Sequence, residues 1–355
     1  MKKVLSFLMA AALIMSFSAC NSSSGNNGEN AASEGNNGAN SAETAVELSL
    51  ANVTSDNGKE AGTKFGELVE QYSDGSITVK QYPDNQLGDD ATTFKMCQQG
   101  DVDIAVGSTS SVSSIYPDYY VYDTPFLFMS KQEVYDVGFG GETGQTISNN
   151  VEKIGLKSLA MWENGFRNLT TNSKPIASVA DLKGLKIRTM ANNVHLAAWK
   201  AMGVSPTPMT FSELYTAMQQ GTVDGQENPI GIILGNNFQE VEKNIIYTEH
   251  VYTPYYVVMN LDKWNSLSDA QQDAISKAMK EATAYQYEIS QKIEDDADEV
   301  FKDAGCTVTH LTAEQKEEFK DAASSANCLE LVKEQMEHPE LADALVSELE
   351  AYRAK

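Results

Sequence analysis

Two arginines and one asparagine are the residues of this sequence best suited to chemistry with an anion. Arg188 lies near the end of "LKIRTM" (185–190), where apolar and polar residues alternate as in a half-buried strand. Arg167 lies in "WENGFRNLTTN", and Asn228 lies in "DGQENP", just after another predicted strand. A guanidinium is a planar fork of donors that matches a carboxylate or a phosphate. These residues could hold an anion at the edge of a sheet, although ion pairs with acidic side chains would explain the arginines equally well.

The motifs of common enzymes are missing from the sequence. It contains no G-x-S-x-G, H-E-x-x-H or G-x-x-x-x-G-K-[ST] motif. The glycine-rich "GFGGETG" (138–144) lacks the spacing of a phosphate-binding motif, and we predict a loop there. The four histidines, His195, His250, His310 and His338, include no i, i+4 pair. We therefore expect no enzyme, cofactor or metal site. An extracellular lyase or hydrolase acting on acidic sugars is a remote alternative.

Composition and charge limit the partners. The chain has 355 residues, enough for two domains, and 41% of them are hydrophobic. Asp and Glu number 50 against 26 Lys and Arg, which gives a net charge of −24. This charge argues against nucleic acid and against an anionic membrane surface as partners. An anionic ligand would also be repelled at long range, so its capture would require local positive groups in a cleft.

The first 44 residues read as export and anchoring signals. "MKK" precedes an apolar run from Val4 to Phe17, which is too short to span a bilayer and indicates a signal peptide, residues 1–20. The "FSAC" that ends at Cys20 resembles a lipobox, whose cysteine is lipidated; an ordinary cleaved signal is the alternative. Residues 21–44 are rich in Asn, Gly, Ser and Ala and indicate a flexible linker. We therefore expect an extracytoplasmic protein that is anchored to the cell membrane by an N-terminal lipid.

Strands and helices alternate through the rest of the chain, which predicts an α/β fold with a largely parallel sheet. The predicted strands are 48–53, 76–82, 101–108, 185–190 and 205–209; the predicted helices are 58–75, 89–100, 177–184, 195–203 and 211–221. "FKMCQQGDVD" (94–103) also matches "YTAMQQGTVD" (215–224), and each combines a helix end, a glycine and the start of a strand. Two similar α/β lobes with a ligand in the cleft between them is the economical interpretation.

The C-terminal third carries the longest helical pattern, residues 268–305, which opens with the capping box "SDAQ". It predicts either one helix that braces both lobes or two helices separated by a kink. Cys97, Cys306 and Cys328 show no C-x-x-C spacing, and a disulfide between Cys306 and Cys328 stays open.

Several motifs resemble one known family. "GFRNLTTNSKPI", "DLKGLKIR" and "SPTPMTFSELYTAMQQGTVDGQENP", with "YPDNQLGDD" and "YDTPFLF" before them, are similar to the solute-binding subunit of tripartite ATP-independent periplasmic (TRAP) transporters of the DctP type. The resemblance runs from about residue 46 to about residue 320. It implies an α/β, two-lobed clamshell of the periplasmic-binding-protein kind, with crossing strands and a long helix that spans both lobes. It also implies that the protein catalyses no reaction but delivers an organic acid to a membrane permease.

The resemblance carries domain limits and ligand contacts onto this sequence. It implies one lobe from 45–164 and about 254–290, a second from 165–253 and about 291–330, and a C-terminal helical segment, 331–355. Arg188 is the implied carboxylate clamp, and Arg167 is a second contact for an anionic ligand. Asn228 would hydrogen-bond the ligand through its amide, and Phe211 would line the pocket. Asn52 and Asp90 are the implied polar contacts in the first lobe.

The same resemblance bears on the ligand and the partners. Gly107 stands where sialic-acid-binding members carry a ligand-binding glutamate, whereas "MANNVHLAAWKAMG" resembles members that bind uronates and aldonates. The predicted ligand is therefore a sugar acid; a C4-dicarboxylate or a 2-oxo acid is the alternative. The expected partners are the permease subunits, and we expect a monomer. A ligand sensor for a membrane signalling protein would share all these features.

Overall fold

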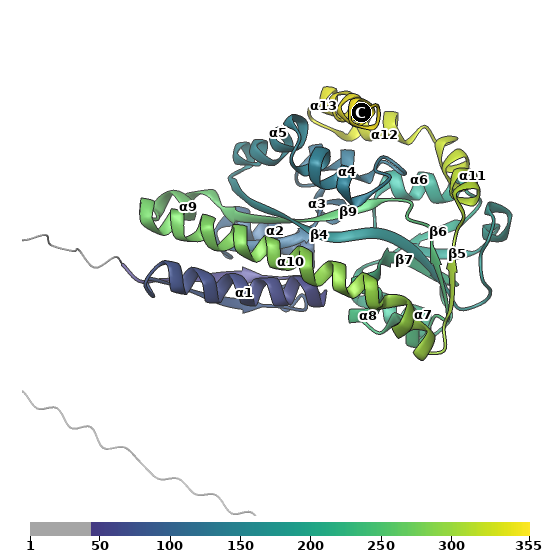
Figure 1. Ribbon diagram of the computed structural model, residues 1–355, viewed down its shortest axis with the longest axis horizontal. Coiled ribbons are helices and arrows are strands. Elements are labelled where there is room, and N and C mark those ends of the chain that lie inside the picture. Colours follow the sequence, from purple (N-terminus) through teal and green to yellow (C-terminus); the bar gives the residue numbers. More distant parts are fainter. Residues whose placement is uncertain (1–43) are drawn as a thin grey trace, which may run out of the picture. The chain divides into compact units, whose positions relative to one another are not determined.

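The computed structural model describes residues 44–355. The predicted signal peptide, Cys20 and all but the last residue of the predicted linker lie outside this range. Within it, ten strands form a connected hydrogen-bonded set in the order β2-β1-β3-β9-β4-β7-β5-β6, with β8 paired to β4 and β10 paired to β8. Figure 1 shows helices on both sides of these strands.

The first lobe is built on three parallel strands in the order β2-β1-β3: β1 (Val46–Ala51), β2 (Ile77–Tyr82) and β3 (Ile104–Ser108). Helices α1 (Asp56–Tyr72) and α2 (Asp90–Gln99) connect them. The Ser55 side chain caps α1 by accepting a hydrogen bond from the Gly58 N–H, and Gly100 ends α2 in the left-handed conformation, at φ 83°.

The second lobe repeats this arrangement. Its parallel strands β5 (Lys186–Thr189), β6 (Ser205–Pro208) and β7 (Gly225–Pro229) follow the order β6-β5-β7, with helices α6 (Asn193–Ala201) and α7 (Phe211–Gln219) as connections. Gly221, the counterpart of Gly100 in the sequence repeat, is also left-handed, at φ 66°. The internal repeat of the sequence therefore corresponds to two units with the same strand order.

Two long antiparallel strands join the lobes. Strand β4 (Leu156–Thr171) pairs with β9 (Tyr252–Asn260) through its first two thirds and with β7 from Arg167 onward. Strand β9 also pairs with β3, while β8 (Asn244–Tyr247) and β10 (Thr307–His310) extend the second lobe. These are the crossing strands of the predicted clamshell, and Figure 1 shows β4 and β9 running through its centre.

The long helix is continuous. Helix α10 (Asp269–Asp303) has 35 residues, about 52 Å at 1.5 Å per residue, and opens with the capping box formed by Ser268 and Gln271. It packs against α1 of the first lobe, β4 and α8 (Ile230–Gly235) of the second lobe (Figure 1). The exact lobe limits stay a prediction, because β4 and α10 run from one lobe into the other without a break.

Short helices complete the chain. Between β3 and β4 lie α3 (Thr109–Val112), η1 (Pro117–Asp123), α4 (Lys131–Glu133), η2 (Val134–Phe139), α5 (Glu142–Asn150) and η3 (Val151–Ile154). The others are η4 (Val179–Leu182), η5 (Phe238–Glu240), α9 (Leu261–Ser266), α11 (Ala313–Ser324), α12 (Cys328–Gln335) and α13 (Glu340–Arg353). The last three form a C-terminal helical segment over α6, η1 and α5 (Figure 1).

Two local predictions were wrong. The glycine-rich segment 138–144 is not a loop: it joins the end of η2 to the start of α5, and a Cβ at Gly144 would lie 2.0 Å from the Gly138 carbonyl oxygen. These glycines therefore allow two helical turns to approach closely. Residues 177–184 form only one short helical turn, η4. The predicted capping box of Ser178 and Asp181 is present and starts this turn, but the left-handed conformation of Gly184 prevents it from continuing as a helix.

The central strand β9 divides two hydrophobic cores. Tyr255, Val257 and Met259 face the core under α1 and α10, whereas Tyr256 and Val258 face the core under η1, α6 and the C-terminal helices. This alternation follows the two-residue period of a strand buried on both faces. The three cysteines of the described chain, Cys97, Cys306 and Cys328, are free thiols.

Candidate ligand-binding site

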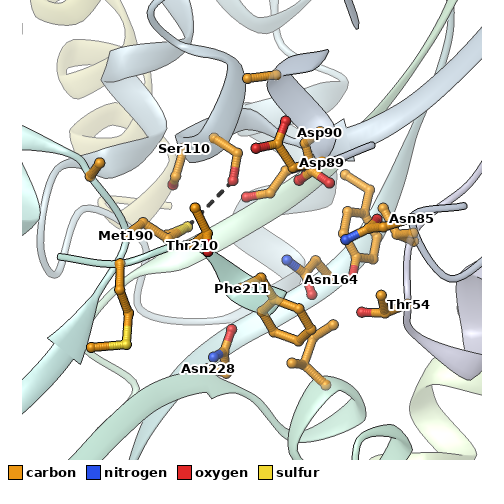
Figure 2. Close-up of a pocket in the computed structure, with 18 of the residues that line it drawn as sticks. Thr54, Asn85, Asp89, Asp90, Ser110, Asn164, Met190, Thr210, Phe211 and Asn228 are labelled. Carbon is orange, nitrogen blue, oxygen red and sulfur yellow. Dashed lines mark hydrogen bonds between the residues drawn. The ribbon is translucent and has the colours of Figure 1, made fainter. Parts of the chain in front are cut away.

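A cavity of about 310 Å³ lies between the two lobes, where β1, β3, β5 and β7 end (Figure 2). Loops and helix starts that follow β1, β2, β3, β5, β6 and β7, together with residues of β4 and β9, supply its walls. Its lining comprises Val53, Thr54, Asn85, Asp89, Asp90, Ala91, Ser108, Ser110, Ser111, Ser114, Asn164, Arg167, Arg188, Met190, Ala191, Met209, Thr210, Phe211, Asn228, Ile232 and Tyr255. The predicted residues Arg188, Arg167, Asn228, Phe211 and Asp90 therefore meet here, and Asn52 does not reach the lining.

Arg188 brings a buried positive charge to this cavity, and no acidic residue of the described chain forms an ion pair with it. Its side chain is 2% exposed, and its Nε and Nη2 atoms donate to the Met209 carbonyl oxygen at 3.2 and 2.9 Å. Nη1 has no partner among the described residues, and the guanidinium carbon lies 5.9 Å from the centre of the Phe211 ring. Burial lowers the pKa of Arg188 to about 10, so the group stays charged at neutral pH.

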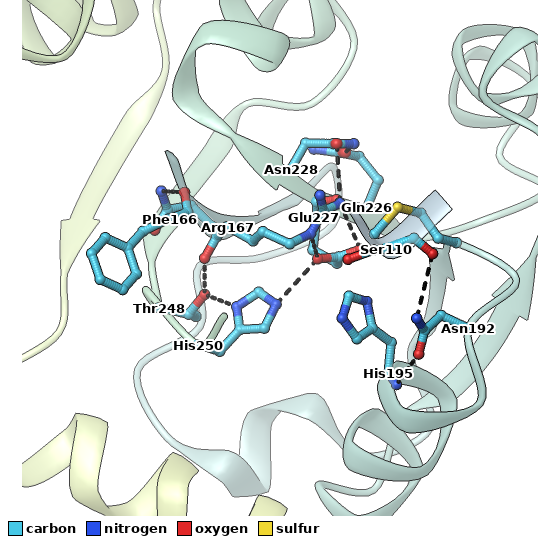
Figure 3. Close-up of polar contacts among 12 residues, drawn as sticks. Ser110, Phe166, Arg167, Asn192, His195, Gln226, Glu227, Asn228, Thr248 and His250 are labelled. Carbon is cyan, nitrogen blue, oxygen red and sulfur yellow. Dashed lines mark hydrogen bonds and ion pairs between the residues drawn. The ribbon is translucent and has the colours of Figure 1, made fainter. Parts of the chain in front are cut away.

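Arg167 lines the same cavity, but its charge is compensated. Its side chain is 1% exposed and forms a bidentate ion pair with Glu227, in which Nη2 lies 2.9 Å from Oε1. His250 places Nε2 3.1 Å from the other Glu227 oxygen (Figure 3). Although burial opposes ionisation, Arg167 and the His250 hydrogen bond hold the pKa of Glu227 far below its usual range, while burial lowers the pKa of His250.

Asn228 and Phe211 complete the second-lobe wall. The Asn228 amide oxygen accepts a hydrogen bond from Arg167 Nη2 at 3.0 Å, and its Nδ2 donates to Gln226 Oε1. Gln226 Nε2 in turn donates to the Thr170 hydroxyl at 2.9 Å. Phe211 is the first residue of α7 and lies beside Arg188. This network fixes the orientation of the Asn228 amide at the C-terminal end of β7.

The first-lobe wall is acidic. Asp90 begins α2, and one of its oxygens accepts a hydrogen bond from the Ser108 N–H at 2.9 Å. Burial, reinforced by the charge of neighbouring Asp89, raises the pKa of Asp90 to about 6. Figure 2 shows Asp89 and Asp90 on one side of the space and Phe211 and Asn228 on the other. The cavity therefore has a cationic side and an anionic side.

Two first-lobe positions are explained by packing. A Cβ at Gly107 would lie 2.9 Å from the Phe94 ring and 3.0 Å from the Asp90 Cβ, so a larger side chain at this position would require its neighbours to shift. The Asn52 amide nitrogen donates to the Gly58 carbonyl and to Gln81 Oε1, both at 2.7 Å. Its oxygen accepts from the Val53 N–H at 2.8 Å, so Asn52 shapes the loop after β1.

A buried cluster that the sequence did not suggest connects the two lobes beside the cavity. Asp123 is fully buried and accepts a hydrogen bond from the Ser110 hydroxyl of the first lobe. From the second lobe, Asn192 Nδ2 lies 2.6 Å and His195 Nε2 3.1 Å from its carboxylate oxygens. Figure 3 shows Ser110, Asn192 and His195 gathered on one side of the Arg167 network. Asp123 lies in "YDTPFLF", and Asn192 and His195 lie in "MANNVHLAAWKAMG", but nothing in the sequence indicates that the two segments meet.

Comparison with known proteins identifies the family. The model of the bacterial extracellular solute-binding proteins of family 7, DctP, matches residues 49–330. The chain belongs to this family. It is 34% identical over 272 residues to the C4-dicarboxylate-binding periplasmic protein DctP of Rhodobacter capsulatus, a match that covers 76% of this chain and 81% of the relative.

Solved structures agree with this assignment. The sugar-acid-binding protein of Advenella mimigardefordensis in complex with galactonate shares 30% identity and a TM-score of 0.82, covering 87% of this chain and 99% of that one. A TRAP periplasmic solute-binding protein of Polaromonas bound to D-erythronate shares 32% identity and a TM-score of 0.78, covering 87% and 99%. The two-lobed fold and the assignment to TRAP solute-binding proteins for organic acids are thus confirmed. Within residues 44–355, no helix is both long and apolar enough to cross a membrane.

Proposed function

We propose that this solute-binding protein captures a monocarboxylic sugar acid, such as an aldonate or a uronate, and delivers it to a TRAP permease. The observation that carries the proposal is the Nη1 atom of Arg188, which is buried at the cavity wall without a partner among residues 44–355. A ligand carboxylate would satisfy this donor and compensate the charge. Because Nε and Nη2 already donate to the Met209 carbonyl, the carboxylate would approach the Nη1 side of the fork.

The charges of the lining favour one carboxylate over two. Arg167 and Arg188 are the cations of the described lining, and Glu227 compensates the first of them. One uncompensated positive charge therefore remains. A second carboxylate that reached across the cavity would meet Asp89 and Asp90, whereas hydroxyl groups could donate hydrogen bonds to them. The complexes of related proteins with galactonate and D-erythronate are consistent with this interpretation.

The predicted export signals give this function its place in the cell. We propose that lipidation of Cys20 and the linker 21–44 tether the binding domain outside the cytoplasmic membrane, close to the permease. A single tether keeps the domain at a high local concentration without fixing its orientation.

Isothermal titration calorimetry with D-galactonate, D-glucuronate, D-erythronate and succinate tests the proposal. We expect at least one of the three sugar acids to bind, and to bind at least about tenfold more tightly than succinate, a difference of about 1.4 kcal/mol. Tightest binding of succinate would instead identify a C4-dicarboxylate carrier. Metabolic labelling with a fatty-acid analogue, compared between wild type and Cys20→Ser, tests the anchor, because only the wild type should incorporate the label.

A further inference from the structure

Asn164 is a cavity residue whose side-chain oxygen is left unpaired within the described protein. Its side chain is 7% exposed, it lines the cavity, and its amide oxygen has no hydrogen-bond partner among residues 44–355 (Figure 2). A buried acceptor without a partner costs free energy, so such a group needs an explanation. A ligand that donates a hydrogen bond would supply one.

A β-bulge places this side chain. Strand β4 is in register with β9 at Trp162 and again at Gly165, but β9 advances by one residue fewer between these points. Glu163 and Asn164 therefore stand opposite a single residue of β9, Pro254, which has no N–H for the ladder. Gly165 has φ 114°, a conformation that favours glycine. Bulges redirect side chains and are frequent beside functional sites.

Helix α10 holds the bulge in place. Gln286, which is fully buried, accepts a hydrogen bond from the Glu163 N–H at 2.9 Å and donates one to the Glu163 carbonyl at 2.7 Å. Its side-chain amide thus replaces the strand partner that the bulge removes. The Glu163 carboxylate is engaged by Lys131, at 2.5 Å, so the side chains at 163 and 164 have separate environments.

We propose that Asn164 determines specificity by accepting a hydrogen bond from one hydroxyl of the bound acid, an inference that rests on the function proposed above. Gln286 is its positioning residue. An oxo group at the same carbon would bring an acceptor against the Asn164 oxygen, and a methylene would leave that oxygen unpaired. The site therefore recognises a hydroxy acid and discriminates against its oxo and deoxy analogues.

A cycle that crosses protein variants with ligand variants tests this role. The probes are D-galactonate and the series of analogues that each lack one of its hydroxyls, measured by calorimetry against wild type and Asn164→Ala. In the wild type, one analogue should bind about tenfold more weakly than D-galactonate. Asn164→Ala should bind D-galactonate about tenfold more weakly and show no further loss with that analogue, because the two changes remove the same hydrogen bond.

Further variants separate recognition from a general structural effect. Asn164→Asp retains an acceptor and should retain the loss with that analogue, even if its charge weakens binding of every acid. Gln286→Met should reduce the same discrimination while D-galactonate still binds. Asn265→Ala, at an exposed position of α9 outside the cavity lining, is the matched control and should change each affinity less than about twofold.

Two results would overturn the inference, and a third would overturn its basis. Asn164→Ala could weaken all the analogues equally, or it could keep the wild-type discrimination; either outcome removes the specificity role. If the wild type binds succinate but none of D-galactonate, D-glucuronate and D-erythronate, the proposed function itself fails. The wild-type titrations thus distinguish that failure from the failure of the role of Asn164.

Discussion

The two buried arginines of the cavity occupy opposite electrostatic environments. Arg167 is fixed by Glu227 and hydrogen-bonded to Asn228, whereas Arg188 contacts a backbone carbonyl and leaves Nη1 without a partner in the described chain. Burial removes both charges from water, which costs free energy. Only Arg167 regains part of that free energy within the described protein, through its ion pair with Glu227. Arg167 is therefore expected to serve mainly the fold, and Arg188 mainly the ligand.

Substitution of Arg167 should produce the largest effect, and the effect should be on stability. Arg167→Met leaves Glu227 buried without its ion-pair partner, so we expect the free energy of unfolding to fall by about 3–5 kcal/mol. Chemical denaturation of the ligand-free protein measures this change.

The double variant Arg167→Met/Glu227→Leu is the control for this prediction. It removes both charges together and should recover most of the lost stability. If the single variant were as stable as the wild type, Arg167 could not be regarded as a structural residue.

Substitution of Arg188 should instead affect ligand affinity. Arg188→Ala is expected to lose about 2–5 kcal/mol of binding free energy for a sugar acid, the range for truncation of one member of a buried charge pair. The unfolding free energy without ligand should change by less than about 1 kcal/mol, since no ion pair is lost. Calorimetry and denaturation of the same samples measure both quantities.

Arg188→Lys sharpens this comparison. It keeps the charge but lacks the planar fork, so its affinity should lie between those of the wild type and Arg188→Ala. A folded Arg188→Ala protein with unchanged affinity would remove the basis for distinguishing the two arginines.

Two buried glutamates show the same contrast with the opposite charge. Arg167 holds the pKa of Glu227 far below its usual range. Fully buried Glu242 has no ion-pair partner among the described residues; it accepts a hydrogen bond from the Thr170 hydroxyl, and burial raises its pKa to about 8. A carboxyl whose pKa is higher in the folded than in the unfolded protein stabilises the fold below the unfolded pKa, and this contribution is lost as the pH rises toward 8.

Glu242→Gln should therefore change the pH dependence of stability. As the pH rises from 5 to 7, the free energy of unfolding of the wild type should fall by about 2 kcal/mol more than that of the variant. Thermal unfolding at both pH values measures the difference. Parallel curves for the two proteins would mean that Glu242 does not titrate in this range.

The smallest expected effect concerns the acidic wall that faces the arginines. Asp90→Asn removes one negative charge from the region that a second ligand carboxylate would enter. At pH 7.5 the affinity for succinate should rise about fivefold, or about 1 kcal/mol, relative to that for D-galactonate. Competition calorimetry measures this ratio. A ratio that did not move would show that Asp90 does not select against dicarboxylates.

The sequence was sufficient for the features that depend on local patterns. The strand–helix alternation and the repeat at 94–103 and 215–224 predict the two lobes, because glycine caps and apolar periodicity are local properties. The role of Arg188 could be predicted for the same reason: an arginine at the end of a strand in a parallel sheet faces the edge where ligands bind.

The sequence was insufficient where the feature depends on pairing between distant segments. Glu227 stands next to Asn228 in "QENP", but its contact with Arg167 requires the antiparallel pairing of β4 with β7, which no local pattern specifies. The Asn164 bulge is similar, although Pro254 in the largely apolar and aromatic segment 252–260 was a usable signal. Asn52 shows the converse, since a position taken from resemblance alone proves to be occupied by hydrogen bonds to Gly58 of α1 and Gln81 of β2.

The most direct test of the account is a crystal structure with the tightest-binding acid among D-galactonate, D-glucuronate, D-erythronate and succinate. The account predicts that a carboxylate oxygen lies within about 3 Å of Arg188 Nη1, while Arg167 keeps its ion pair with Glu227. A bound acid whose carboxylate lies elsewhere, with Arg188 still bonded only to the Met209 carbonyl, would contradict it.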